Sequence, residues 1–123
     1  MNSFLIQNFS NYNLTQLEKY KGVKDICQLE LGRAKSKRMN EFKNGKKPST
    51  LTSDIKNLYN YYSENMQRVL VCMSDISREI LDNELLDPCD DPFWWDMLCS
   101  KTTYYKRRAA MVDEFLFYYF DSF

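Results

Sequence analysis

A long amphipathic run in the middle of the sequence constrains the fold most strongly. From Ile55 to Leu81, apolar side chains recur at intervals of three and four residues, the spacing of one helix face. Ser53 precedes the run and can cap a helix there. The chain of 123 residues contains only three Gly and three Pro, too few for the many turns of an all-β protein. These features predict an all-α fold.

A further helix is predicted on each side of this run. Thr15 and Glu18 have the spacing of a capping box, so a first helix should begin there and extend to about Asn44, with two glycines at which it can bend or split. Residues 44–54 have the composition of a loop. A last helix is expected from Lys101 to Phe120.

The apolar periodicity also predicts which residues face the core. For the first helix they are Leu17, Tyr20, Ile26, Cys27, Leu29, Leu31, Ala34, Met39 and Phe42. For the last helix they are Tyr104, Arg108 by its stem, Met111, Val112, Phe115, Leu116 and Tyr119.

The length predicts a single domain, a small bundle of four to five helices. Its parts are an N-terminal arm with a basic helix (1–47), a long middle helix with an acidic loop (48–90), and a helix-turn-helix with an aromatic C-terminal helix (91–123).

The charges are segregated along the chain although the formal net charge is zero. Residues 33–47 contain seven cations and one anion, whereas residues 75–96 contain eight anions and one cation. Residues 101–108 then contain four cations and no anion. Such blocks permit a nucleic-acid-facing surface and an acidic surface on one small protein, although solvated charged faces are the more frequent explanation of each block.

Several classes of function are not expected. The chain has no histidine, so it contains no Ser-His or Cys-His nucleophile pair, and it has no Gly-rich phosphate loop. An enzyme and a cofactor are therefore not expected. The four cysteines form no CxxC pair, which favours buried free thiols over a metal site. The N-terminus lacks the features of a signal peptide and no long apolar stretch occurs, so we expect a cytoplasmic protein without membrane association.

Residues 91–120 have the plan of a helix-turn-helix. Asp91 and Pro92 can start a short helix, Ser100 or Thr102 can cap the next one, and that second helix opens with polar and basic residues. Tyr104 is expected to point inward beside Phe93, Trp94 and Met97. The predicted DNA-binding residues are Ser100, Lys101, Thr102, Thr103, Tyr105, Lys106 and Arg107. The predicted accessory phosphate-contacting residues are Arg33, Lys35, Lys37 and Arg38.

The stretch CSKTTYYKRRAAMVDEF resembles the end of phage late-gene and autolysin transcription regulators of the ArpU/RinA type. These are similar to the promoter-reading fourth region of sigma factors. The order of residues 99–107 matches the family's turn and the aromatic and basic residues that follow it, and the match covers about 25 residues. The resemblance implies a transcription regulator that binds duplex DNA, alone or together with RNA polymerase.

Two hypotheses about function therefore stand. The first is a DNA-binding transcription regulator of phage or mobile-element type. The alternative is a non-catalytic, phage-encoded inhibitor or adaptor that binds a protein partner through its acidic face or its aromatic tail. That tail, FLFYYFDSF, carries aromatic side chains on every side of a helix, which predicts either burial against the N-terminal arm or a homodimer interface.

Overall fold

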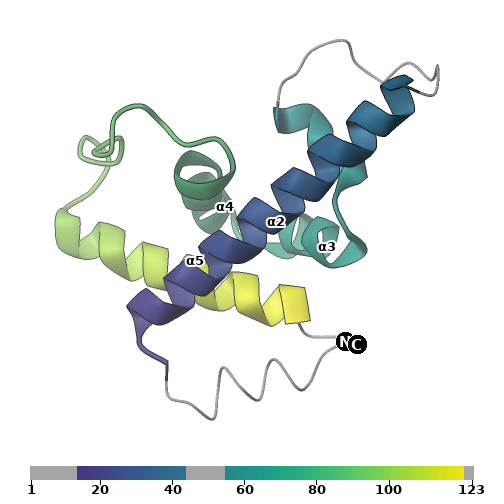
Figure 1. Cartoon of the computed structure of the whole chain (residues 1–123). Helices are drawn as coiled ribbons and strands as arrows, with labels where there is room; N and C mark the ends of the chain where they lie inside the picture. The colour runs from purple at the N-terminus through teal and green to yellow at the C-terminus, as the bar shows by residue number, and fades with distance from the viewer. Residues whose placement is uncertain (1–13, 44–54, 121–123) are drawn as a thin grey trace.

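The computed structural model describes residues 14–43 and 55–120, and all regular secondary structure in these ranges is helical (Figure 1). The elements are α2 (Gln16–Lys43), the 3-10 helix η1 (Ile55–Tyr61), α3 (Glu64–Cys72), α4 (Asp75–Leu81), the π-helical turn η2 (Asp82–Leu86) and α5 (Lys101–Phe120). The predicted all-α class is confirmed, with four α-helices in the described ranges. None of the described helices is long and apolar enough to cross a membrane.

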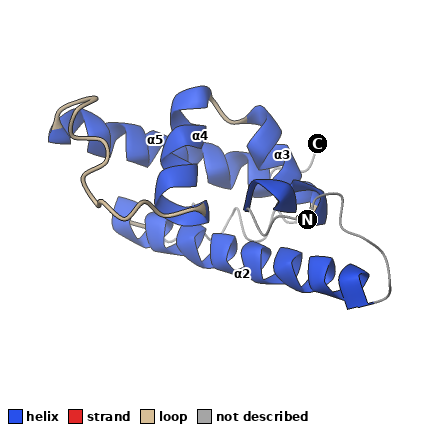
Figure 2. Ribbon diagram, turned by 90° about the horizontal axis from the view of Figure 1, so that it is seen from above, coloured by secondary structure: helices blue, strands red, loops and turns tan. Residues whose placement is uncertain are grey.

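The longest helix, α2, lies along one side of a group formed by α3, α4 and α5 (Figure 2). Both α3 and α4 pack on α5. α2 crosses α5 obliquely while running in the same general direction (Figure 1). Tyr20 of α2 contacts Arg108 near the start of α5, and Glu30 contacts Tyr119 near its end. The largest fully buried side chains lie between these helices and are Tyr104, Phe115, Leu58, Met66, Leu81 and Met111.

α2 begins with the predicted capping box. The Thr15 amide donates to Glu18 Oε1 at 3.0 Å, and the Glu18 amide donates to Thr15 Oγ1 at 3.1 Å. The helix continues through both glycines without a break. A Cβ built on Gly32 meets no atom within 4 Å, so this glycine is not required by packing.

The predicted inward face of α2 is partly wrong. The buried residues are Val23, Cys27, Glu30 and Ala34, which recur at four, three and four positions and form one narrow stripe. Cys27 and Ala34 were predicted to be buried, whereas Val23 and Glu30 were not. The expected core residues that are instead exposed are Leu17, Leu29, Met39 and Phe42. A single face of α2 contacts the rest of the fold, so apolar residues outside that stripe remain in solvent.

The amphipathic run from Ile55 to Leu81 is not one helix. It is divided into η1, α3 and α4, and the breaks fall at Ser63 and Ser74. Ser63 Oγ accepts a hydrogen bond from the Met66 amide at 3.2 Å, and Ser74 Oγ accepts one from the Ser77 amide at 3.4 Å. Both serines therefore act as N-caps in extended backbone and start new helices. The predicted cap at Ser53 lies outside the described residues.

α5 has the predicted bounds and the predicted inward face. Tyr104, Met111, Val112 and Phe115 are buried, and the other expected inward residues are half-buried. Most of the described residues of the aromatic tail are buried or half-buried, and Phe120 is among the buried ones. The exception is Phe117, which is 54% exposed. Arg68 of α3 holds the end of this helix, because its Nε donates to the Tyr118 carbonyl at 2.7 Å.

Candidate nucleic-acid interface

The segment before α5 forms consecutive turns and not the predicted short helix, so a C-terminal helix-turn-helix is not confirmed. Asp91 does cap this segment, since its Oδ1 accepts from the Phe93 amide at 2.8 Å. The Asp96 amide then donates to the Phe93 carbonyl, and the Leu98 amide donates to the Trp95 carbonyl, in the three-residue spacing of turns. A segment of seven residues gains too few backbone hydrogen bonds to offset helix nucleation by itself.

Two tryptophans pack this segment on α5. The Trp95 ring stacks on Tyr104 with centroids 4.5 Å apart and an angle of 9°, and Trp94 meets the same tyrosine edge-on at 5.8 Å. Tyr104 is inward as predicted and contacts Trp94. The other predicted neighbours, Phe93 and Met97, are exposed.

Ser100 provides the start of α5. Its Oγ accepts from the Thr103 amide at 3.2 Å and donates to Thr103 Oγ1 at 3.0 Å. Of the two predicted caps, Ser100 is therefore the one used, and Thr102 lies within the helix. The positive end of the helix dipole points out of the molecule at this cap, where it favours an anion.

The side chains predicted to contact DNA are presented together on the first two turns of α5. Lys101, Thr102, Tyr105, Lys106 and Arg107 are all exposed, and Thr103 is half-buried because it bonds Ser100. No ion pair in the described part of the chain uses Lys101, Lys106 or Arg107. Three cations, a hydroxyl and a phenol therefore project from one helix end.

Arg108, the fourth cation of this block, has an internal role. Its guanidinium carbon lies 4.1 Å from the centroid of Tyr20 and 4.7 Å from that of Tyr105, a cation-π contact on two rings. Tyr20 also donates a hydrogen bond of 2.6 Å to Glu84. Burial is the main cause that raises the pKa of Tyr20 far above its ordinary value, followed by this bond. Arg108 thus fastens α2 to α5 beneath the exposed cations.

The predicted accessory cations lie elsewhere. Arg33, Lys35 and Lys37 are exposed and Arg38 is half-buried, all in the second half of α2. Because Tyr20 is level with Arg108 and the two helices run in the same general direction, Lys35 lies roughly 25 Å along the molecule from Lys106. The structure therefore does not bring the two basic regions into one patch.

Acidic and apolar side chains border the exposed cations. Asp90, Asp91 and Asp96 are exposed on the segment before α5. Met97 is 94% exposed and Leu98 is 62% exposed on the same segment. Phosphates that approach α5 would have to pass on the side away from these carboxylates.

The cysteines do not gather. All four thiols are free, but only Cys27 is buried, so the expectation of buried thiols is wrong for Cys72 and Cys89, which are exposed. Burial raises the pKa of the Cys27 thiol well above its ordinary value, so this thiol stays protonated. Within residues 14–43 and 55–120, no group of three Cys, Asp or Glu side chains could hold a metal ion.

Sequence reasoning missed two polar clusters at the helix breaks. Glu30 accepts hydrogen bonds from Ser63 and Tyr119, and Glu114 accepts from Ser74 and Ser77. The available signal was a serine followed by an acidic residue, at Ser63 and Ser74, in the middle of an otherwise regular run.

No family model, curated protein or solved structure matches the chain.

Proposed function

We propose that the protein is a non-catalytic DNA-binding transcription regulator of phage or mobile-element type, which contacts duplex DNA with the first two turns of α5. One observation carries this proposal: the polar and basic residues at 101, 102 and 105–107 are exposed while Tyr104 between them is buried. A helix that reads DNA needs this division, since its inward side must be anchored while its first turns are free to enter the groove.

The anchoring contact also supports the proposal. In a helix-turn-helix the first helix holds the recognition helix at a fixed angle. Here the Trp95 ring, stacked on Tyr104, would serve that purpose from a turn segment. The resemblance of residues 99–107 to regulators of the ArpU/RinA type is in keeping with this role. RNA polymerase or a second copy of the chain would be a further partner at a promoter.

The roles of the exposed residues follow from their chemistry. Lys101, Lys106 and Arg107 would neutralise phosphates, and Arg107 is the cation best suited to bidentate bonds with a guanine edge. Thr102 and Tyr105 can donate to base edges or phosphates, and Ser100 directs the free amides of the helix start toward a phosphate.

A gel-shift series tests the proposed function. Duplex DNA from around the gene that encodes the chain should bind at low salt and be released as the salt concentration rises. Lys106→Glu combined with Arg107→Glu should weaken binding roughly 100-fold, because two contacts become repulsive. The matched control is Lys21→Glu with Lys24→Glu, which makes the same charge change at two exposed positions of α2.

The control pair should bind DNA within about threefold of the wild type. If the wild type binds no duplex at low salt, the proposed function is wrong. If the control pair loses as much affinity as the α5 pair, binding depends only on overall charge and α5 is not the interface.

A further inference from the structure

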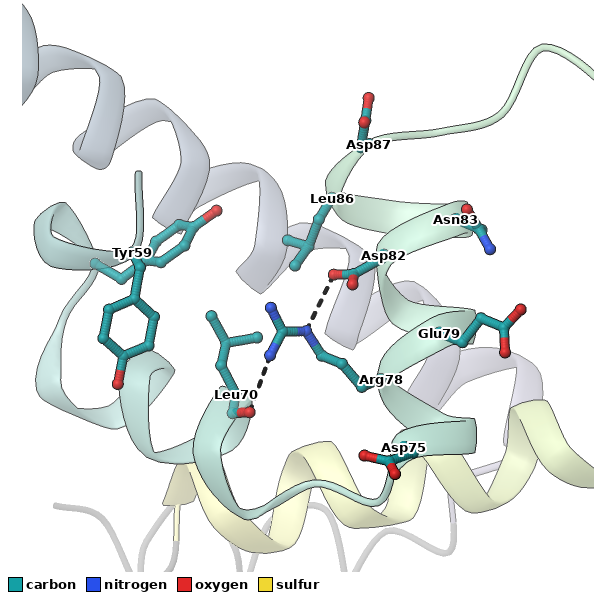
Figure 3. Close-up of a pocket in the computed structure, with 10 residues that line it drawn as sticks. Tyr59, Leu70, Asp75, Arg78, Glu79, Asp82, Asn83, Leu86 and Asp87 are labelled. Atoms are coloured by element: carbon teal, nitrogen blue, oxygen red, sulfur yellow. Dashed lines mark hydrogen bonds and ion pairs between the residues drawn. The ribbon is translucent and has the colours of Figure 1, made fainter. Parts of the chain in front are cut away.

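A groove between two parts of the fold has the features of a second binding site (Figure 3). It has a volume of about 510 Å³, in the range of pockets that take small ligands or side chains of a partner. Tyr59 of η1, Leu70 of α3 and Tyr62, which lies between these elements, line one side of it. Arg78 of α4 and Asp82 and Leu86 of η2 line the other side. None of these residues belongs to the proposed DNA interface.

Arg78 is fixed at the centre of the groove. Figure 3 shows its side chain extending from α4 toward Leu70, with Tyr59 beyond it. Its Nη1 donates to the Leu70 carbonyl at 2.9 Å, and its Nε donates to Asp82 Oδ1 at 3.1 Å. Asp82 therefore neutralises the charge of Arg78, so this pair adds no net charge to the groove.

Tyr62 contributes a hydroxyl group that lacks a partner. The residue is 6% exposed, lines the groove, and its hydroxyl oxygen is buried without a hydrogen bond. Burial is the main cause that raises its pKa to about 12, so the hydroxyl keeps its proton at neutral pH. Because this oxygen has no accessible surface, a bound segment cannot reach it, and Tyr62 serves only as part of the groove wall.

Three further carboxylates give the groove its charge. Asp75, Glu79 and Asp87 also line it, are exposed, and form no ion pair with a described residue. Figure 3 shows Glu79 and Asp87 directed outward, away from the Arg78–Asp82 pair. The rim is thus strongly negative, which repels nucleic acid and attracts cations.

We infer that this groove binds a basic segment of a partner protein. Lysine or arginine side chains of that segment pair with the three rim carboxylates. The methylene stems of its long side chains lie against Tyr59 and Leu86. Such a site would let one molecule hold DNA at α5 and a basic protein at the groove.

A labelled peptide provides the direct test. The probe is a fluorescein-labelled peptide of sequence Gly-Arg-Lys-Arg-Gly-Arg-Lys-Arg-Gly, and binding is followed by fluorescence polarisation at low salt. Asp75→Asn, Glu79→Gln and Asp87→Asn together should weaken binding about tenfold. The matched control is Asp90→Asn, Asp91→Asn and Asp96→Asn, which removes the same charge from exposed residues outside the groove and should cost less than about twofold.

Tyr59→Ala separates a defined groove from general attraction. Tyr59 is exposed and lines the groove, so the variant should fold, and it should bind the peptide about threefold more weakly because the stems of the long side chains lose one wall. An equal loss in both triple variants, or full affinity in the groove variant, overturns the site. Full affinity in Tyr59→Ala overturns the contact of the stems with the groove wall. DNA binding should be unchanged in all these variants, so the groove and the α5 interface can fail independently.

Discussion

The two serines that divide the middle of the chain are held in the same way but in different surroundings. The Ser63 amide and hydroxyl donate to Glu30 of α2 at 3.1 and 2.6 Å. The Ser74 amide and hydroxyl donate to Glu114 of α5 at 2.9 and 3.0 Å. In each case a glutamate on a long helix accepts both donors of an N-cap serine, and so fixes the start of a short helix.

The difference lies in burial. Glu30 is 2% exposed and accepts a third bond from the Tyr119 hydroxyl at 2.6 Å. Glu114 is half-buried and Ser74 is exposed, although the third donor, the Ser77 hydroxyl, belongs to a buried residue. If Glu30 is removed, its donors lose a buried partner, whereas water can replace Glu114 at Ser74. Matching hydrogen-bond patterns therefore need not contribute equally to stability.

The largest expected effect is that of Glu30→Ala. Loss of the carboxylate leaves three donors unpaired near the centre of the fold, and we expect the free energy of unfolding to fall by about 3 kcal/mol. Urea denaturation followed by circular dichroism measures this. A loss below about 1 kcal/mol would show that the buried cluster is no more important than an exposed one.

Glu114→Ala should have a smaller effect. Water can reach Ser74, so we expect the free energy of unfolding to fall by about 1 kcal/mol in the same experiment. Glu64→Ala is the control, because Glu64 is an exposed acidic residue in the first turn of α3, and its loss should change stability by no more than about 0.5 kcal/mol. If Glu114→Ala lowers the free energy of unfolding as much as Glu30→Ala does, burial does not distinguish the two clusters.

At neutral pH Tyr119→Phe should have an effect no larger than that of Glu114→Ala, about 1 kcal/mol, because it removes one hydrogen bond to Glu30. It should also change the response to alkali. Burial, and then the bond to Glu30, raise the pKa of Tyr119 above its ordinary value of 10.0. Above pH 10 the unfolded chain loses this proton while the folded chain keeps it, so stability falls as pH rises.

The wild type should therefore lose stability between pH 10 and pH 11 more steeply than Tyr119→Phe. Urea denaturation at pH 7, 10 and 11 measures the difference. Glu114→Ala should keep the full alkaline slope of the wild type, because the donors at its cluster are serines that do not titrate. If the free energy of unfolding falls equally with pH in the wild type and in Tyr119→Phe, the titration of Tyr119 does not contribute to the loss of stability in alkali.

Local signals in the sequence were sufficient for α5 and for the start of α2. The capping pair Thr15 and Glu18 needs only three residues of separation, and the inward face of α5 follows from its apolar spacing. The exposed position of Lys101, Lys106 and Arg107 followed from the same spacing. In the candidate interface, local patterns therefore predicted which side of α5 faces solvent.

The remaining features depend on contacts between distant residues. The apolar spacing from Ile55 to Leu81 continues across Ser63 and Ser74, so periodicity could not show that new helices begin there. The burial of Glu30 depends on Ser63 and Tyr119, which are 33 and 89 residues away in sequence. The turns before α5 pack on that helix through Trp94 and Trp95, which share the Tyr104 ring.

The position of Arg108 between two tyrosine rings sets how DNA binding should respond to salt. Each phosphate neutralised by the protein releases condensed counterions, and the logarithm of the affinity falls by about 0.9 per contact for each unit of the logarithm of salt concentration. Arg108 contacts Tyr20 and Tyr105 and is not free to contact a phosphate. The cations of α5 that remain available to phosphates are Lys101, Lys106 and Arg107. Binding through this helix alone should therefore give a slope of about −2.7, and a fourth cation would make it steeper.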